Sequence, residues 1–193
     1  MKIINKILLL TLTFISINVN GQDRNQDSIL VAETVYDFFE WYIYSNKYEN
    51  NEENRPVFRI NSSDTVQLDL TKYLANLTKY KFSETLLNKE RLAYKACEDN
   101  LNKMTKEKFL SFDDIFEYEN IGCDFDNSYK WIGGQELCDG IKINRQIFID
   151  NTSRQVEIEY YSINGEEKSF WRNSIVISLI KVKNEWIITD VDI

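Results

Sequence analysis

Residues 141–193 set the fold, and they read IKINRQIFID NTSRQVEIEY YSINGEEKSF WRNSIVISLI KVKNEWIITD VDI. Apolar side chains alternate with polar ones in four successive runs, which is the two-residue period of a half-buried strand. Short polar turns separate the runs, at 150–153, 164–165 and 183–185. The middle turn is Asn164-Gly165, and Asn-Gly between alternating runs is the strongest short hairpin signal. The pattern predicts an antiparallel meander with one buried face.

The N-terminal half supplies the cover that such a sheet requires. Apolar residues recur at helical spacing from about residue 28 to 44, and Asp27 or Ser28 is suited to cap this helix. The opposite face of the helix carries acidic residues that we interpret as a solvated row, namely Glu33, Asp37 and Glu40.

Two further patterns lie between this helix and the meander. Residues 57–60 and 65–68 flank a polar turn and predict a small hairpin. A helix begins at Ser83, a favourable N-cap residue, and its apolar stripe continues to Met104. Residues 105–140 lack such a period. The side chains that we expect to be largely buried are Phe38, Tyr42, Leu87, Leu101, Ile158, Ile177 and Trp186.

The first 21 residues have the order of a secretory signal peptide. Lys2 and Lys6 precede an apolar run at 7–17, and small residues follow at 19–21. The run is too short to span a bilayer. We therefore expect residues 1–21 to be removed before Gln22 and the protein to be exported, to the periplasm or beyond the cell. The remainder, residues 28–193, is predicted to be one α+β domain in which helices pack in a curved antiparallel sheet, an α+β cone.

Composition excludes several function classes. The formal charge is -8, and it becomes -10 when Lys2 and Lys6 are removed. Such a chain repels phosphate backbones and anionic lipid heads, so nucleic-acid binding and membrane insertion are not expected. The sequence contains no histidine, which excludes Ser-His-Asp and Cys-His catalysis and histidine-containing metal sites. No catalytic residue, metal or cofactor is predicted, and the partner is an unknown protein or small molecule.

A loop rich in Asp, Gly and aromatic residues is the candidate recognition surface, because loops on a rigid scaffold commonly carry function. Its proposed binding residues are Asp124, Asp126, Trp131 and Gln135. The alternative is a structured turn that only covers the fold. The spacing of Asp124, Asp126 and Ser128 has the beginning of a calcium loop, but Tyr129 stands where glycine is needed and Gln135 where glutamate is needed.

Three cysteines remain in the exported chain, Cys97, Cys123 and Cys138. An oxidising compartment allows one disulfide among them. Cys123 and Cys138 flank the glycine-containing loop, whereas Cys97 lies on the buried stripe of a helix. We predict a Cys123–Cys138 bridge, and a Cys97–Cys123 bridge is the rival.

Several blocks of the chain resemble a known family in their order. They include VYDFFEWY at 35–42, YKACE at 94–98, GGQE at 133–136 and VKNEWII at 182–188. They resemble the family catalogued as domain of unknown function 3828, which is similar in fold to the nuclear transport factor 2 and cystatin-like superfamily. The resemblance implies a cone-shaped fold and export from a bacterial cell. It supplies no catalytic residues.

Two functions follow as hypotheses. The first is an exported, non-catalytic binding or interaction module. The second is a small-molecule enzyme in which a carboxylate and a tyrosine in an apolar pocket transfer a proton without histidine. The residues that helix and sheet are able to aim inward for that purpose are Tyr36, Tyr160, Trp171 and Asp190.

Overall fold

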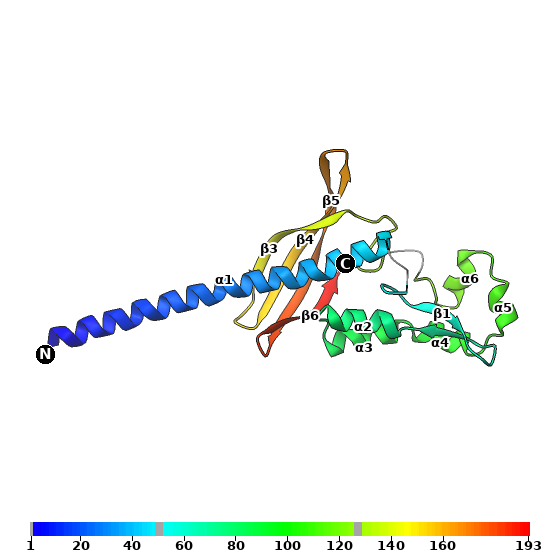
Figure 1. Cartoon of the computed structure of the whole chain (residues 1–193), viewed down its shortest axis with the longest axis horizontal. Helices are drawn as coiled ribbons and strands as arrows, with labels where there is room; N and C mark the ends of the chain where they lie inside the picture. The colour runs from blue at the N-terminus through cyan, green and yellow to red at the C-terminus, as the bar shows by residue number, and fades with distance from the viewer. Residues whose placement is uncertain (1, 49–51, 126–128) are drawn as a thin grey trace.

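The computed structural model of the chain describes residues 2–48, 52–125 and 129–193 (Figure 1). Side chains are described from residue 25 onward, except at 172–173. The predicted site residue Asp126 therefore lies outside the described residues.

The C-terminal third forms the predicted meander. Its strands are β3 (Gly140–Phe148), β4 (Ser153–Asn164), β5 (Glu167–Val182) and β6 (Glu185–Asp192). They pair in the order β3-β4-β5-β6, and every pair is antiparallel. Each of the three ladders contains a register shift, and such bulges bend a strand and increase its twist. The result is an open antiparallel sheet, so the α+β prediction is confirmed.

Tight turns join the strands where the sequence places them. Asn164 pairs with Glu167, and Gly165 takes a φ of 65° at the first position of the turn. Lys183 and Asn184 connect β5 to β6 with φ of 49° and 69°, the left-handed pair that a type I′ turn requires. The hairpin predicted from Asn164-Gly165 is present, but Asn164 is the last paired residue of β4, and the two turn residues are Gly165 and Glu166.

Helix α1 (Lys2–Tyr48) crosses one face of the sheet (Figure 1). Its buried stripe includes Val31, Val35, Phe38 and Tyr42, and it contacts β3 and β6. The predicted cap at Asp27 or Ser28 is wrong, because the helix continues on the N-terminal side of both residues. A capping preference is a local signal, and it does not exclude a helical continuation.

The remaining helices are short, and they are α2 (Thr71–Lys79), α3 (Glu84–Ala93), α4 (Lys95–Leu101), α5 (Lys106–Leu110) and α6 (Ile115–Asn120). Ser83 caps α3 as predicted, since its hydroxyl accepts the N–H of Leu86 at 3.2 Å. The single helix expected from Ser83 to Met104 is instead two helices, because Tyr94 ends α3 with ψ near 3°.

The predicted hairpin is also present, with β1 (Val57–Ile60) paired antiparallel to β2 (Val66–Asp69). This hairpin, α4, α5 and the Cys123 turn enclose a small second apolar cluster at the end of the molecule away from the sheet (Figure 1). Its buried members are Val66, Cys97, Leu101, Phe109 and Cys123. The main cluster lies between α1, α2, α3 and the sheet. All seven residues predicted to be buried are at most 5% exposed.

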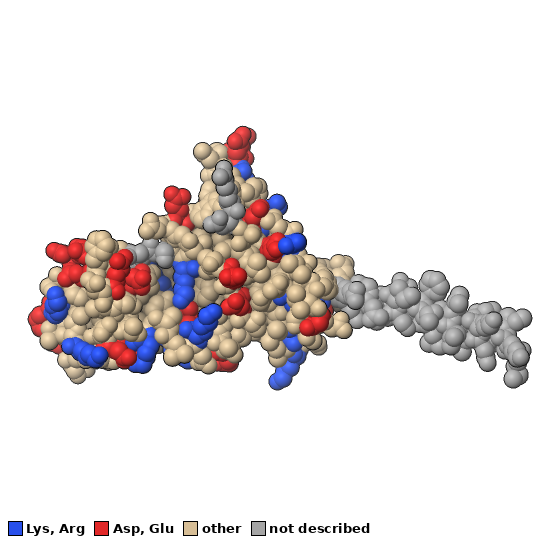
Figure 2. Space-filling model, turned by 180° about the vertical axis from the view of Figure 1, so that it is seen from behind, with Lys and Arg blue, Asp and Glu red and all other residues tan. Residues whose placement is uncertain are grey.

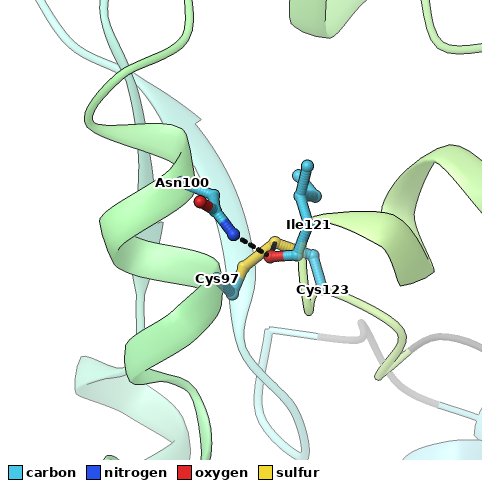
Figure 3. The surroundings of a disulfide bond; sticks show 4 residues. All are labelled: Cys97, Asn100, Ile121 and Cys123. Atoms are coloured by element: carbon cyan, nitrogen blue, oxygen red, sulfur yellow. Dashed lines mark hydrogen bonds between the residues drawn. A yellow bond between two sulfur atoms is a disulfide. The ribbon is translucent and has the colours of Figure 1, made fainter.

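The disulfide joins Cys97 to Cys123, so the predicted Cys123–Cys138 bridge is wrong and its rival is correct (Figure 3). Gly122 has a φ of 73° and turns the chain back over α4. The side-chain amide of Asn100 on α4 also donates to the carbonyl of Ile121 at 3.1 Å. Cys97 and Cys123 are thereby buried in the second cluster with Cα atoms 4.9 Å apart. Cys138 is instead buried in the main cluster as a free thiol.

Candidate functional site

The predicted recognition loop does not present its large aromatic residue. Trp131 is 4% exposed and belongs to the main core. Its indole N–H donates to the Tyr73 hydroxyl at 3.1 Å, and its carbonyl accepts the Tyr160 hydroxyl at 2.6 Å. Asp124 and Gln135 are exposed on the loop. Trp131 is therefore a core residue that anchors the loop, and in this structure it does not lie on a surface that a ligand would reach.

The described part of the same loop does not bring metal ligands together. Within the described ranges, no group of three or more Cys, Asp or Glu side chains lies close enough together to hold a metal ion. Asp126 and Ser128 of the partial calcium pattern lie outside those ranges.

A buried carboxylate lies next to the anchor of this loop. Glu90 on α3 is 3% exposed. Its Oε1 accepts the Tyr73 hydroxyl at 2.6 Å, and its Oε2 lies 2.6 Å from the ammonium of Lys130. Burial raises the pKa of Tyr73 well above its usual value and also raises the pKa of Tyr94, which contacts the same carboxylate. Both oxygens of Glu90 are occupied, so this cluster joins α3 to the loop and offers no free base.

The four residues suggested for an enzyme pocket do not form one site, although two of them, Tyr160 and Trp171, are in contact. Asp190 is half exposed and lies 3.3 Å from the ammonium of Lys89. Tyr160 is buried, and Trp171 packs edge-on against its ring while donating its indole N–H to Ser162 at 3.0 Å. The hydroxyl of Tyr36 accepts the N–H of Ile143 at 3.5 Å. Asp190 therefore does not share a desolvated pocket with a tyrosine.

A groove of about 930 Å³ is the candidate site. It runs along the exposed face of the C-terminal half of α1, with α2 on one side and the start of β3 on the other. Among the described residues, its aromatic lining consists of Tyr36, Trp41, Tyr44, Tyr48, Tyr80 and Tyr161. Its charged lining consists of Asp37, Glu40, Lys47, Glu53, Lys79 and Asp139. The groove thus combines broad aromatic surface with a small number of charges.

Helical spacing explains how α1 forms the floor. Residues three, four and seven apart share one face of a helix. Asp37, Glu40 and Tyr44 have this spacing and are exposed. Tyr44 is followed by Tyr48 one turn later, with ring centroids 5.1 Å apart. Trp41 borders this face and stacks on Tyr80 from the end of α2.

The β3 side of the groove is held by an ion pair. The ammonium of Lys47 donates to a carboxylate oxygen of Asp139. The other carboxylate oxygen accepts the backbone N–H of Ile163 at 2.5 Å. The Lys47 contact is the main reason that the pKa of Asp139 lies below its usual value. Asp139 thereby joins α1 to the sheet, and the charge of Lys47 is neutralised.

The α2 side is held by an amide–carboxylate hydrogen bond and a cation–aromatic contact. The amide of Asn76 donates to the carboxylate of Glu53 at 2.7 Å. The ammonium of Lys79 lies 5.1 Å from the centre of the Tyr80 ring, a distance at which a cation is attracted to an aromatic face. The groove therefore already contains one cation–aromatic contact.

The carboxylates on the floor of the groove, Asp37 and Glu40, differ in their contacts from those on its two sides, Asp139 and Glu53, which are bound by Lys47 and Asn76. In the part of the chain that the structure describes, Asp37 and Glu40 form no ion pair with a lysine or arginine. Elsewhere, acidic and basic side chains are interspersed over the face seen in Figure 2, unlike the basic surface of a nucleic-acid-binding protein. The floor of the groove is thus a local acidic surface.

Sequence reasoning identified the acidic row but missed the aromatic residues beside it. Glu33, Asp37 and Glu40 are exposed as predicted. Trp41, Tyr44 and Tyr48 occupy the same side of α1, and large aromatic residues on a solvated helix face were the signal for a binding surface. The contribution of Tyr80 carries no local signal, since it depends on the packing of α2.

No family model, curated protein or solved structure matches this chain. Among the described residues, no helix combines the length and apolar character needed to cross a bilayer.

Proposed function

We propose that this protein is an exported, non-catalytic binding module, and that the groove along α1 is its ligand site. The observation that carries the proposal is the combination of an aromatic lining with two floor carboxylates, Asp37 and Glu40, that form no ion pair with any basic side chain the structure describes. A volume of about 930 Å³ falls in the usual range of small-ligand sites.

The fold that we propose is the cone of the nuclear transport factor 2-like superfamily. Two features support it. Helix α1 packs on one face of an open four-stranded antiparallel sheet, and bulges in all three ladders bend that sheet. The sequence blocks that resemble domain of unknown function 3828 support the same assignment.

The chemistry of the site supports binding without turnover. General acid–base catalysis requires a titratable group that is within reach of substrate and has a pKa suited to the task. The desolvated carboxylate of Glu90 is occupied by Tyr73 and Lys130, and the carboxylates of Asp37 and Glu40 are on an exposed helix face. The groove provides recognition surface, and no activated nucleophile is present among its described lining residues.

The proposal is tested by screening short peptides and small organic molecules by ligand-observed NMR. Tyr44→Ala removes aromatic surface from the groove, and it should fold normally because Tyr44 is 55% exposed. Phe116→Ala on α6 is the matched control, since Phe116 is 66% exposed outside the groove. We expect ligands that bind the wild type and the control but not the groove variant.

Two results would overturn the proposal. Ligands lost in Gln135→Ala but retained in Tyr44→Ala would move the site to the loop. Conversion of a bound ligand to a product, detected by mass spectrometry and lost in a groove variant, would make the protein an enzyme.

A further inference from the structure

We propose that the ligand of the groove is an extended peptide segment carrying arginine side chains. This inference rests on the proposed function and adds the chemical class of the ligand. Three properties of the groove lead to it: the charge of its floor, the aromatic rings beside that charge, and its length.

The acidic side chains of α1 are the first of these three properties. Glu33, Asp37 and Glu40 follow one another within two turns of α1 and are exposed. Asp37 and Glu40 line the groove, and Glu33 lies outside its lining. Like charges three and four residues apart on a helix destabilise it slightly, and no described basic side chain forms an ion pair with any of the three. Of the two lysines among the described residues that line the groove, Lys47 is paired with Asp139 and Lys79 lies over the Tyr80 ring. A cationic ligand would relieve this repulsion.

The aromatic rings narrow the class of cation. The indole of Trp41 and the phenol of Tyr80 lie stacked beside the acidic floor, and Tyr44 is exposed within it. A guanidinium group is planar, stacks on aromatic faces and donates two parallel hydrogen bonds to a carboxylate. Arginine therefore fits a floor in which a carboxylate and an aromatic face lie one helical turn apart, as Glu40 and Tyr44 do.

The length of the floor favours a peptide over a single small cation. The lining residues of α1 run from Tyr36 to Tyr48, and twelve helical steps at about 1.5 Å each give a floor of about 18 Å. An extended peptide rises about 3.3 Å per residue. The groove therefore accommodates about five residues of an extended chain.

The test uses three blocked pentapeptides of equal length, Gly-Arg-Gly-Arg-Gly and its versions with glutamine or glutamate in place of arginine. Binding is followed by isothermal titration calorimetry and by tryptophan fluorescence, to which Trp41 contributes as the one of the four tryptophans found among the described groove-lining residues. We expect saturable binding of the arginine peptide below about 1 mM. Binding should weaken between about 20 and 200 mM salt, because exposed charges are screened.

A double variant that removes the two floor charges, compared with a control double variant elsewhere, shows where the peptide binds. Asp37→Asn/Glu40→Gln keeps the side-chain shapes of the floor and should weaken the arginine peptide about tenfold, since each exposed ion pair contributes modestly. Glu107→Gln/Asp113→Asn is the matched control. It makes the same charge change at two exposed positions outside the groove, and its affinity should stay within about twofold of the wild type.

The outcomes separate failure of the inference from failure of the proposed function. Equal binding of the glutamine peptide, lost in Tyr44→Ala, would refute the arginine class and leave the groove as the site. Equal weakening by both double variants would show non-specific attraction to an acidic protein and refute the inference. Tetramethylammonium that binds as tightly as the arginine peptide would replace the peptide by a small organic cation. If none of the three peptides binds, the inference is wrong.

Discussion

The ring of Trp41 stacks on the ring of Tyr80, with 4.6 Å between the ring centroids and 18° between the ring planes. The first residue lies on the solvent side of α1, and the second is the C-cap of α2. The contact therefore joins two elements and at the same time forms one wall of the groove. It couples the stability of the α1–α2 interface to the shape of the candidate site.

Replacing Trp41 should show whether its contact with Tyr80 stabilises the interface between α1 and α2 as well as forming a wall of the groove. We expect Trp41→Ala to lower the free energy of unfolding by about 1–2 kcal/mol, because a half-buried aromatic pair is lost. Trp41→Phe retains a ring on Tyr80 and should lose less than half of that amount. Urea unfolding followed by circular dichroism measures both. Equal stability of the wild type and Trp41→Ala would show that the stacked pair does not hold α2 in place.

The disulfide should stabilise the second apolar cluster. Cys97 and Cys123 are 26 residues apart, and the chain-entropy model gives about 3.5 kcal/mol for a loop of that size. We expect Cys97→Ala/Cys123→Ala to lose about this much stability, and Cys138→Ala to leave the bridge intact. Non-reducing peptide mapping of exported protein checks the pairing. A Cys123–Cys138 peptide, or free thiols at both Cys97 and Cys123, would contradict the structure.

The free thiol of Cys138 should be unreactive in the folded protein. Burial raises its pKa to about 11, and the thiolate is the reactive species. At pH 8 we therefore expect iodoacetamide to modify Cys138 only after unfolding in guanidinium chloride. Rapid modification of the native protein, quantified by intact mass, would show that Cys138 is accessible.

Stability should fall steeply in alkaline solution. Burial is the largest cause that raises the pKa of Tyr42, Tyr73, Tyr94 and Tyr160 above the usual value. A raised pKa in the folded state means that the unfolded chain releases these protons first as pH rises. The stabilisation is therefore complete below about pH 10, the ordinary tyrosine value, and is lost progressively above it.

Absorbance of tyrosinate near 295 nm and circular dichroism should together record this alkaline transition. We expect the buried tyrosines to ionise only as the secondary structure is lost. Tyr73→Phe and Tyr160→Phe each remove one of the four groups together with one buried hydrogen bond, to Glu90 and to the carbonyl of Trp131 respectively, so the two variants are compared. Ionisation of all tyrosines before any loss of structure would contradict the burial of these groups.

Removal of residues 1–21 should leave the folded core unchanged. Val31 is the first buried core residue among the described side chains of α1, so the packing contacts of α1 with the sheet lie beyond the expected cleavage point. We expect exported protein to begin at Gln22, as read by N-terminal sequencing. A chain expressed from Gln22 should have the same urea midpoint as the exported protein. Exported protein that retains Met1 would refute the predicted signal peptide.

Core packing was predictable because it follows local periods. The two-residue alternation of Val156, Ile158 and Tyr160 placed all three on the buried face of β4. The helical spacing of Phe38 and Tyr42 placed them on the buried stripe of α1. Each of these patterns is a property of one segment, so a single sequence contains the whole signal.

Only the tertiary structure decided the disulfide pairing, the burial of Trp131 and the position of the groove. Cys123 pairs with Cys97 because Gly122 turns the chain over α4. Trp131 enters the core because Tyr73 and Tyr160, from different elements, provide partners for its polar atoms. The groove is formed by side chains from α1, the end of α2 and the start of β3, which only the tertiary structure brings together. Residue spacing fixes which face of a segment is apolar, whereas the distance between two segments depends on how every layer packs, and that information is spread over the whole chain.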